Sequence, residues 1–250
     1  MLFIILILSF PLQGFCADPG TEIIQKVYDR YEGDDSEATY MMTLENEGGD
    51  RRIREMTIFR KDFGDLEKRL IRFSSPAEIA GTGFLNWDNI GKGDDQFLYL
   101  PALKRVRRVV STQKHLRFVN TDFTNEDMER REVELDDHEL LDSEDYRGLK
   151  CHIIRSTPRE STNSQYGHTM SWVAKDIDLP VKVEYYDRKG NHVKTYEAQA
   201  LKKIDGIWTG TKTVMTDNER KHRTTLELKS IQYNKGLPDN YFTKAFLSSY

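Results

Sequence analysis

The stretch YMMTLENEGGDRRIREMTIF, residues 40–59, decides the fold class. In its first part Tyr40, Met42 and Leu44 recur at every second position, which is the period of a β-strand with one buried face. The glycines and polar residues of NEGGD are typical of a hairpin turn, and RRIREMTIF returns as the partner strand. The stretch therefore predicts an antiparallel β-hairpin.

Further strand-like runs follow along the chain, joined by turn sequences such as RKGN at 188–191. The runs are DLEKRLIRF, TGFLNWD, DQFLYL, KCHIIRS, HTMSWVAK, PVKVEYYD, HVKTYEAQAL, GIWTGTKTVM and TTLELKSIQY. With the hairpin they predict about eleven strands, without the strand–helix alternation that builds parallel sheets. An antiparallel sheet of this size must curl, close or split, because its open edges would otherwise be long.

One amphipathic helix is predicted near the N-terminus, with Thr21 as its cap and Gly33 beyond its end. The residues that recur at helical spacing in it are Ile23, Ile24, Val27, Tyr28 and Tyr31. This apolar stripe must pack on another element, and a face of the sheet is the natural candidate.

Residues 1–17 have the features of a secretory signal peptide, because an apolar run is followed by Pro11 and small residues. The run is about half of the roughly 20 residues that a membrane span needs, so we expect cleavage after Cys16 or Ala17. Lipid attachment to Cys16 is the alternative, although Phe15 is larger than the residue that usually precedes a lipidated cysteine. The prediction is a periplasmic domain, residues 18–250, with no transmembrane segment.

The composition argues against several classes of function. A formal net charge of −4 disfavours nucleic acid as a partner, because nucleic-acid-binding domains usually carry net positive charge. No two histidines have the spacing of a local metal motif, and no G-x-S-x-G elbow is present, so no metal, cofactor or catalytic serine is predicted. Cys151 lies in a strand-like run and is predicted to be a small buried residue. Paired carboxylates are recognised by their separation in space, so a hydrolase stays open as an alternative.

Some strands carry apolar residues on both faces. Phe97 and Tyr99 lie opposite Leu98 and Leu100, and Met170 and Trp172 lie opposite Val173. Such strands must be covered on both sides. A plain sandwich core and a ligand cavity both explain this pattern.

The basic run KRVRR places Lys104, Arg105, Arg107 and Arg108 within five positions. We expect these cations to contact anionic lipid headgroups or an acidic partner, or to pair with the acid-rich segment 126–145. No ladder of aromatic residues follows the run, so single-stranded nucleic acid is disfavoured again.

Three ordered blocks carry a family resemblance: PAEIAGTGFL at 76–85, FLYLPALKRVRR at 97–108 and TDFTNEDM at 121–128. Together they resemble the periplasmic outer-membrane lipoprotein-sorting proteins of the LolA-like superfamily, and most closely the branch associated with lipid-exporting transporters. The resemblance implies an open, strongly curved antiparallel half-barrel with helices over its concave side. It also implies an apolar cavity for acyl chains between the sheet and the helices.

The function implied by the resemblance is that of a non-enzymatic periplasmic carrier or chaperone for a lipid or lipoprotein. An inner-membrane transporter is its implied partner. The residues predicted to line the cavity are Phe84, Trp87, Phe97, Tyr99, Met170 and Trp172. A cell-envelope adaptor that binds a protein partner without a lipid cavity is the alternative function.

Overall fold

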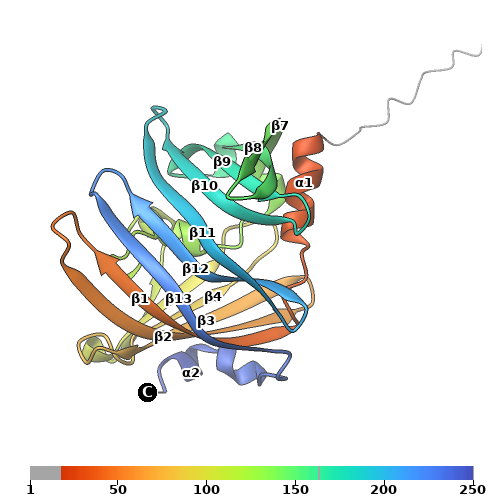
Figure 1. Cartoon of the computed structure of the whole chain (residues 1–250). Coiled ribbons are helices and arrows are strands. Elements are labelled where there is room, and N and C mark those ends of the chain that lie inside the picture. The colour runs from red at the N-terminus through yellow and green to blue at the C-terminus, as the bar shows by residue number, and fades with distance from the viewer. Residues whose placement is uncertain (1–17, 163, 250) are drawn as a thin grey trace, which may run out of the picture.

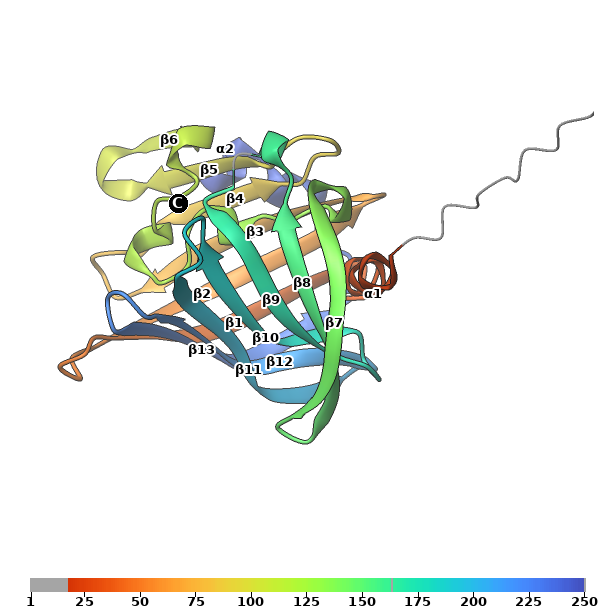
Figure 2. The same cartoon turned by 90° about the horizontal axis from the view of Figure 1, so that it is seen from above.

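The computed structural model describes residues 18–162 and 164–249, so the predicted signal peptide at 1–17 lies outside the described residues. The described strands form one antiparallel sheet in the order β6-β5-β4-β3-β2-β1-β13-β12-β11-β10-β9-β8-β7. The strands are β1 (Asp35–Glu45), β2 (Arg51–Phe63), β3 (Leu66–Ser75), β4 (Gly83–Trp87), β5 (Asp95–Leu100), β6 (Arg105–Val109), β7 (Asp136–Tyr146), β8 (Leu149–Pro158), β9 (Tyr166–Ala174), β10 (Leu179–Asp187), β11 (His192–Ile204), β12 (Ile207–Asp217) and β13 (His222–Tyr233). The sheet is open, because β6 and β7 form its two edges, and it curls strongly around a hollow (Figures 1 and 2).

The predicted mainly-β half-barrel is therefore present, but the sheet has thirteen strands rather than about eleven. The two strands that were not counted, β6 and β7, are its edge strands. Their sequences, RVRRV and DDHELLDSEDY, are charged and lack the apolar alternation of central strands. Charged side chains on an edge strand hinder its pairing with other chains. The same charges take the place of the apolar alternation by which a strand is predicted from sequence.

Helix α1 (Pro19–Tyr28) begins earlier than predicted. Asp18 is the N-cap in place of Thr21, because its side chain accepts a 2.8 Å hydrogen bond from the Gly20 backbone N–H. Pro19 follows in the first turn, where its missing N–H has no partner to lose. The helix ends at Tyr28, and Tyr31 beyond it is exposed.

The apolar stripe of α1 packs on the β7–β9 end of the sheet. Ile23 lies in one buried cluster with Ile154 of β8 and Val173 of β9. Ile154 pairs with Ser171, Ser171 with Val183, and Val183 with Tyr196, so these four residues point to one face of the sheet. Tyr196 faces the hollow, and the helix therefore lies on the concave face. Figure 2 shows the helix end-on beside β7. None of the helices in the described part of the chain is long and apolar enough to cross a membrane.

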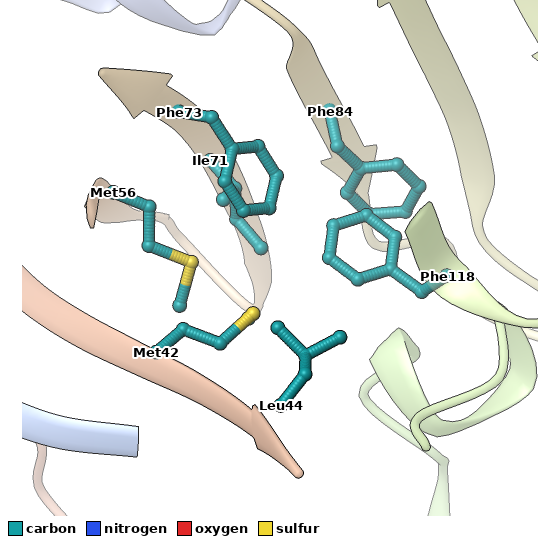
Figure 3. Close-up of a cluster of buried hydrophobic side chains, with 7 residues drawn as sticks. All are labelled: Met42, Leu44, Met56, Ile71, Phe73, Phe84 and Phe118. Atoms are coloured by element: carbon teal, nitrogen blue, oxygen red, sulfur yellow. The ribbon is translucent and has the colours of Figure 1, made fainter. Parts of the chain in front are cut away.

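The segment between β6 and β7, residues 110–135, crosses the hollow as a series of short 3-10 helices. Its Phe118 packs between Phe73 and Phe84, with ring centroids 6.2 and 4.9 Å away, and Met56 of β2 and Met42 of β1 belong to the same cluster on the neighbouring strands (Figure 3). This cluster joins the crossing segment to the concave face. Asp122 fastens the segment to β13.

The C-terminal segment, which holds the 3-10 helix Asp239–Phe242 and α2 (Lys244–Leu247), packs on the outside of β3 and β4. Phe242 and Leu247 are almost fully buried there, against Leu70 and Leu85. Figure 1 shows this segment below the sheet, on the side away from the hollow. The curved sheet thus has a packed outer face here, and its inner face is partly filled by the crossing segment.

Candidate functional site

A cavity of about 440 Å³ lies on the concave face, between the central strands and the crossing segment. Its size is within the range of roughly 300–1,000 Å³ that is usual for small-molecule sites. The apolar residues that line its sheet wall include Tyr40, Met42, Met56, Ile58, Leu226 and Ile231. Met42 and Met56 have flexible, polarizable side chains that adapt to ligands of irregular shape.

The register of the strands explains why these residues share the wall. Tyr40 of β1 pairs with Met56 of β2, and Ala38 pairs with Ile58, which in turn pairs with Ile71 of β3. Directly paired residues point to the same face of a sheet, so the apolar positions of the first hairpin become rows across the hollow. The alternation that predicted the hairpin therefore also marked the cavity wall, although it gave no sign that space is left above it.

The roof of the cavity comes from the crossing segment, through Phe118, Phe123, Asp127 and Met128. Asp127 pairs with Lys194 of β11 and accepts a 2.8 Å hydrogen bond from the Tyr166 hydroxyl. Burial and the nearby Asp127 carboxylate raise the pKa of Tyr166 well above its usual value, so the hydroxyl keeps its proton and donates. The roof is thus held to β9 and β11 by buried polar contacts.

A second anchor of the roof is Asp94, which precedes β5. Its carboxylate accepts hydrogen bonds from Asn86 Nδ2 at 2.6 Å and from the Arg130 backbone N–H at 3.2 Å. Burial raises the pKa of Asp94 to about 7, and the carboxylates of Glu129 and Asp88 add to the effect. The contact between the sheet and the crossing segment near Arg130 therefore contains a carboxyl that changes charge near neutral pH.

One end of the cavity is polar. Arg30, Glu32, Arg60 and Arg69 all line it. Glu32 pairs with Arg30 and lies 3.7 Å from Arg60 Nε, while the buried Glu67 accepts from both Arg60 and Arg69. Carboxylates and guanidiniums therefore alternate in a continuous chain of ion pairs at this end.

Of the six residues predicted to line the cavity, Phe84 lies on the concave face, and the other five lie on the convex face. Phe84 packs against Phe118 of the crossing segment and is not among the residues that line the cavity. Trp87, Phe97 and Tyr99 belong to the cluster beneath the C-terminal segment, where Trp87 Nε1 donates to the Phe242 carbonyl at 2.9 Å. The strand period placed these three residues together, but the sequence did not show that the C-terminal segment covers their face.

Met170 and Trp172 belong to another cluster, with Cys151 and Val181. Lys182 Nζ lies 3.9 Å from the centre of the Trp172 ring. In β9 these two side chains alternate with Ser171, which lies in the same cross-strand row as Tyr196. Because Tyr196 lines the cavity, Met170 and Trp172 point away from the hollow. Cys151 is buried, as predicted.

The basic run is on the exposed edge strand β6 and the turn before it. Lys104, Arg105, Arg107 and Arg108 are all exposed. Arg108 pairs with Asp95, whose pKa is lowered by this contact against the opposing effect of burial. Within the described residues the other three cations form no ion pair, so pairing with the acids of 126–145 does not occur in this structure. Exposed Leu103 and Val110 flank the strand.

Within residues 18–162 and 164–249, no three His, Cys, Asp or Glu side chains are grouped so that they could hold a metal ion. The acids that line the cavity are engaged by cations instead: Glu32 by Arg30, and Asp127 by Lys194. The site therefore combines an apolar wall, a polar end and a roof that is fixed by ion pairs.

Comparison with known proteins agrees with this geometry. A family model with the description "Uncharacterized protein" matches residues 65–249. A DUF1329 family protein from Desulfovibrio piger is 31% identical, with a TM-score of 0.87 over 92% of this chain and 100% of that one. The chain belongs to this family. None of the curated proteins matches its sequence.

Two further solved structures connect this DUF1329 protein with the LolA-like superfamily. A domain from Vibrio parahaemolyticus assigned as an outer membrane lipoprotein-sorting protein is 35% identical, with a TM-score of 0.86 over 92% of this chain and 98% of that one. A LolA superfamily protein from Nitrosomonas europaea shares the fold at 19% identity, with a TM-score of 0.70 over 91% of this chain and 98% of that one. The predicted resemblance to the LolA-like superfamily is confirmed.

Proposed function

We propose that this DUF1329 protein is a periplasmic carrier that holds the acyl chains of a lipid or lipoprotein in its concave cavity. The observation that carries the proposal is the row of apolar side chains, including Tyr40, Met56 and Ile58, that faces a 440 Å³ space instead of a second sheet. Each methylene that leaves water for such a wall contributes about 0.8 kcal/mol. The assignment of the Vibrio relative to lipoprotein sorting points the same way.

The geometry favours a carrier over an enzyme. A carboxylate-dependent hydrolase needs two carboxyl groups that converge on one reacting bond. Glu32 and Asp127 line the cavity, but each is paired with a cation and contributes to the polar end or to the roof. An adaptor without a cavity would not need the space between the crossing segment and the sheet.

The proposed carrier works in the periplasm, after removal of residues 1–17, and exchanges its cargo with an inner-membrane transporter. We assign docking on an anionic membrane surface to β6. Lys104, Arg105 and Arg107 are exposed there and form no ion pair with another described residue, and the apolar Leu103 and Val110 beside them are exposed as well. Cations next to exposed apolar side chains suit the boundary between headgroups and acyl chains.

The test of the carrier function is direct. The protein is purified from bacterial periplasm without detergent and extracted with organic solvent, and the extract is analysed by mass spectrometry. Acylated lipid or lipopeptide near one molecule per protein supports the carrier. Protein without lipid that also fails to take up added fatty acid supports the adaptor.

A further inference from the structure

The cavity wall changes character from one cross-strand row to the next. Arg60 of β2 pairs with Ser36 of β1 and with Arg69 of β3, so these three polar residues form one row on the concave face. Two residues along each strand, the next row of the same face is Ala38, Ile58 and Ile71. The wall is thus polar at one end and apolar over the rows that follow.

Arg69 has N–H donors that none of the described residues accepts from. Its Nη2 donates to Glu67 Oε1 at 2.6 Å, and no other described residue accepts from its remaining N–H groups. Its side chain is 28% exposed, and it lines the cavity. Water can satisfy these N–H groups while the cavity is empty. An acyl chain that expels the water would leave them without a partner, which is costly unless the ligand brings an acceptor.

The neighbouring guanidiniums of Arg60 and Arg30 differ from Arg69 in how many of their N–H donors have a protein acceptor. Arg60 donates to the Gly33 carbonyl at 2.7 Å and to Asp62 at 2.5 Å, besides its contact with Glu67, so it is almost saturated. Arg30 donates to the Trp208 carbonyl at 3.2 Å and pairs with Glu32. Arg69 is therefore the member of the row that is best placed to receive an acceptor from a ligand.

The ion pairs leave the polar end of the cavity without net charge. Arg30, Arg60 and Arg69 line it, against the carboxylates of Glu32 and Asp127. Asp127 belongs to the roof and is neutralised by Lys194. Glu67 pairs with both Arg60 and Arg69, and Asp62 pairs with Arg60, although neither carboxylate lines the cavity and the Glu67 side chain is only 5% exposed. The three guanidiniums are thus matched by the carboxylates of Glu32, Asp62 and Glu67, and what this end offers an anion is the set of unused N–H donors of Arg69.

We propose that the cavity binds an amphiphile in one orientation, with an anionic carboxylate or phosphate head on Arg69 and the acyl chain along the rows of Ile58 and Met56. This inference rests on the proposed carrier function and adds the chemical class and direction of the ligand. The unused N–H groups of a guanidinium can donate to the two oxygens of such a head. In this orientation the oxygens of the head accept from the Arg69 N–H groups that an apolar chain alone would leave without a partner.

The test compares two probes with the same number of carbon atoms and different head groups. The neutral dye N-phenyl-1-naphthylamine is bound to the purified protein at pH 8, and dodecanoate or 1-dodecanol is added as competitor. We expect dodecanoate to displace the dye at a concentration at least about tenfold lower than 1-dodecanol, although the alcohol is the more apolar of the two. Dodecyl phosphate in a third series tells whether phosphate serves as well as carboxylate.

The matched variants are Arg69→Gln and Lys68→Gln. Lys68 is the adjacent residue of β3, but it lies on the convex face, beside Phe63 and Trp87. Arg69→Gln is expected to weaken dodecanoate binding about tenfold, which corresponds to about 1.4 kcal/mol, with 1-dodecanol unchanged. Lys68→Gln is expected to leave the binding of both dodecanoate and 1-dodecanol unchanged. Arg69→Lys is expected to keep part of the wild-type preference for dodecanoate that Arg69→Gln loses.

The outcomes separate the two proposals. If neither amphiphile displaces the dye from the wild-type protein, the carrier function fails, and the orientation fails with it. If both displace it equally well, or if Arg69→Gln weakens both to the same extent, the carrier stands and the oriented headgroup is refuted. The wild-type preference between the two probes tests the orientation even if a variant does not fold.

Discussion

Truncation of Phe242 tests the division of the sheet into a structural convex face and a ligand-binding concave face. Phe242 is 1% exposed and packs edge-on against Phe63, with ring centroids 5.6 Å apart. Its carbonyl also accepts the Trp87 indole N–H. Removal of a fully buried phenyl ring costs about 3–5 kcal/mol of unfolding free energy. For a domain of this size that corresponds to a fall in Tm of about 6–20 °C.

The assay is urea unfolding followed by tryptophan fluorescence, together with dodecanoate binding to the folded variant. Phe242→Ala is expected to lower the unfolding free energy by the stated amount and to leave the dissociation constant for dodecanoate unchanged. Asn240→Ala is the control, because Asn240 is an exposed residue of the same 3-10 helix. A loss below about 1 kcal/mol, or weaker dodecanoate binding at low urea, would refute the assignment of the two faces.

Three further predictions concern the cavity, its roof and the edge strand. Ala38 lines the cavity floor, so Ala38→Phe is expected to occupy ligand space and to weaken dodecanoate binding at least about tenfold in the dye-displacement assay; unchanged binding would show that the chain lies elsewhere. The pKa of Asp94 is raised by burial, so its protonation stabilises the fold at acid pH, and this stabilisation is lost as the pH rises from about 4 toward 7. The free energy of unfolding is measured in urea at pH 4 and at pH 8. From the lower to the higher pH, Asp94→Asn is expected to become about 2–4 kcal/mol more stable relative to the wild type. A difference in unfolding free energy that is the same at both pH values would contradict the raised pKa. Simultaneous reversal of Lys104, Arg105 and Arg107 to Glu is expected to weaken binding to vesicles that contain phosphatidylglycerol at least about 100-fold, because each lost cation contributes roughly 1 kcal/mol and each added carboxylate is repelled. The matched control reverses the exposed Lys202, Lys203 and Lys229, and an equal loss there would show that only the net charge matters.

The architecture was largely predictable because strand period is a local property. Tyr40, Met42 and Leu44 share a face in the sequence pattern, and they share the concave face in the structure. The two edge strands were missed because an edge strand has one neighbour and no need for apolar alternation. Their place in the sheet depends on pairing with β5 and β8, which is not encoded in their own composition.

The faces of the strands were harder to predict than the strands themselves. A run such as Phe97-Leu98-Tyr99 shows that both sides are covered, but not which cover is protein and which is open space. The answer lies far away in the sequence: Phe242 and Leu247 cover one side and Phe118 covers the other. The chain of ion pairs from Arg30 to Arg69 was missed for the same reason, because its members come from separate segments that only the folded sheet brings together.

The most direct test of the central claim is a crystal structure of the protein with 12-bromododecanoate, in which the bromine is located by its anomalous scattering. The carrier account predicts a single strong bromine peak inside the concave cavity, next to the side chains of Met42 and Met56, at full occupancy when the ligand is saturating. A bromine peak outside the cavity, or a cavity without bromine under the same conditions, would contradict it.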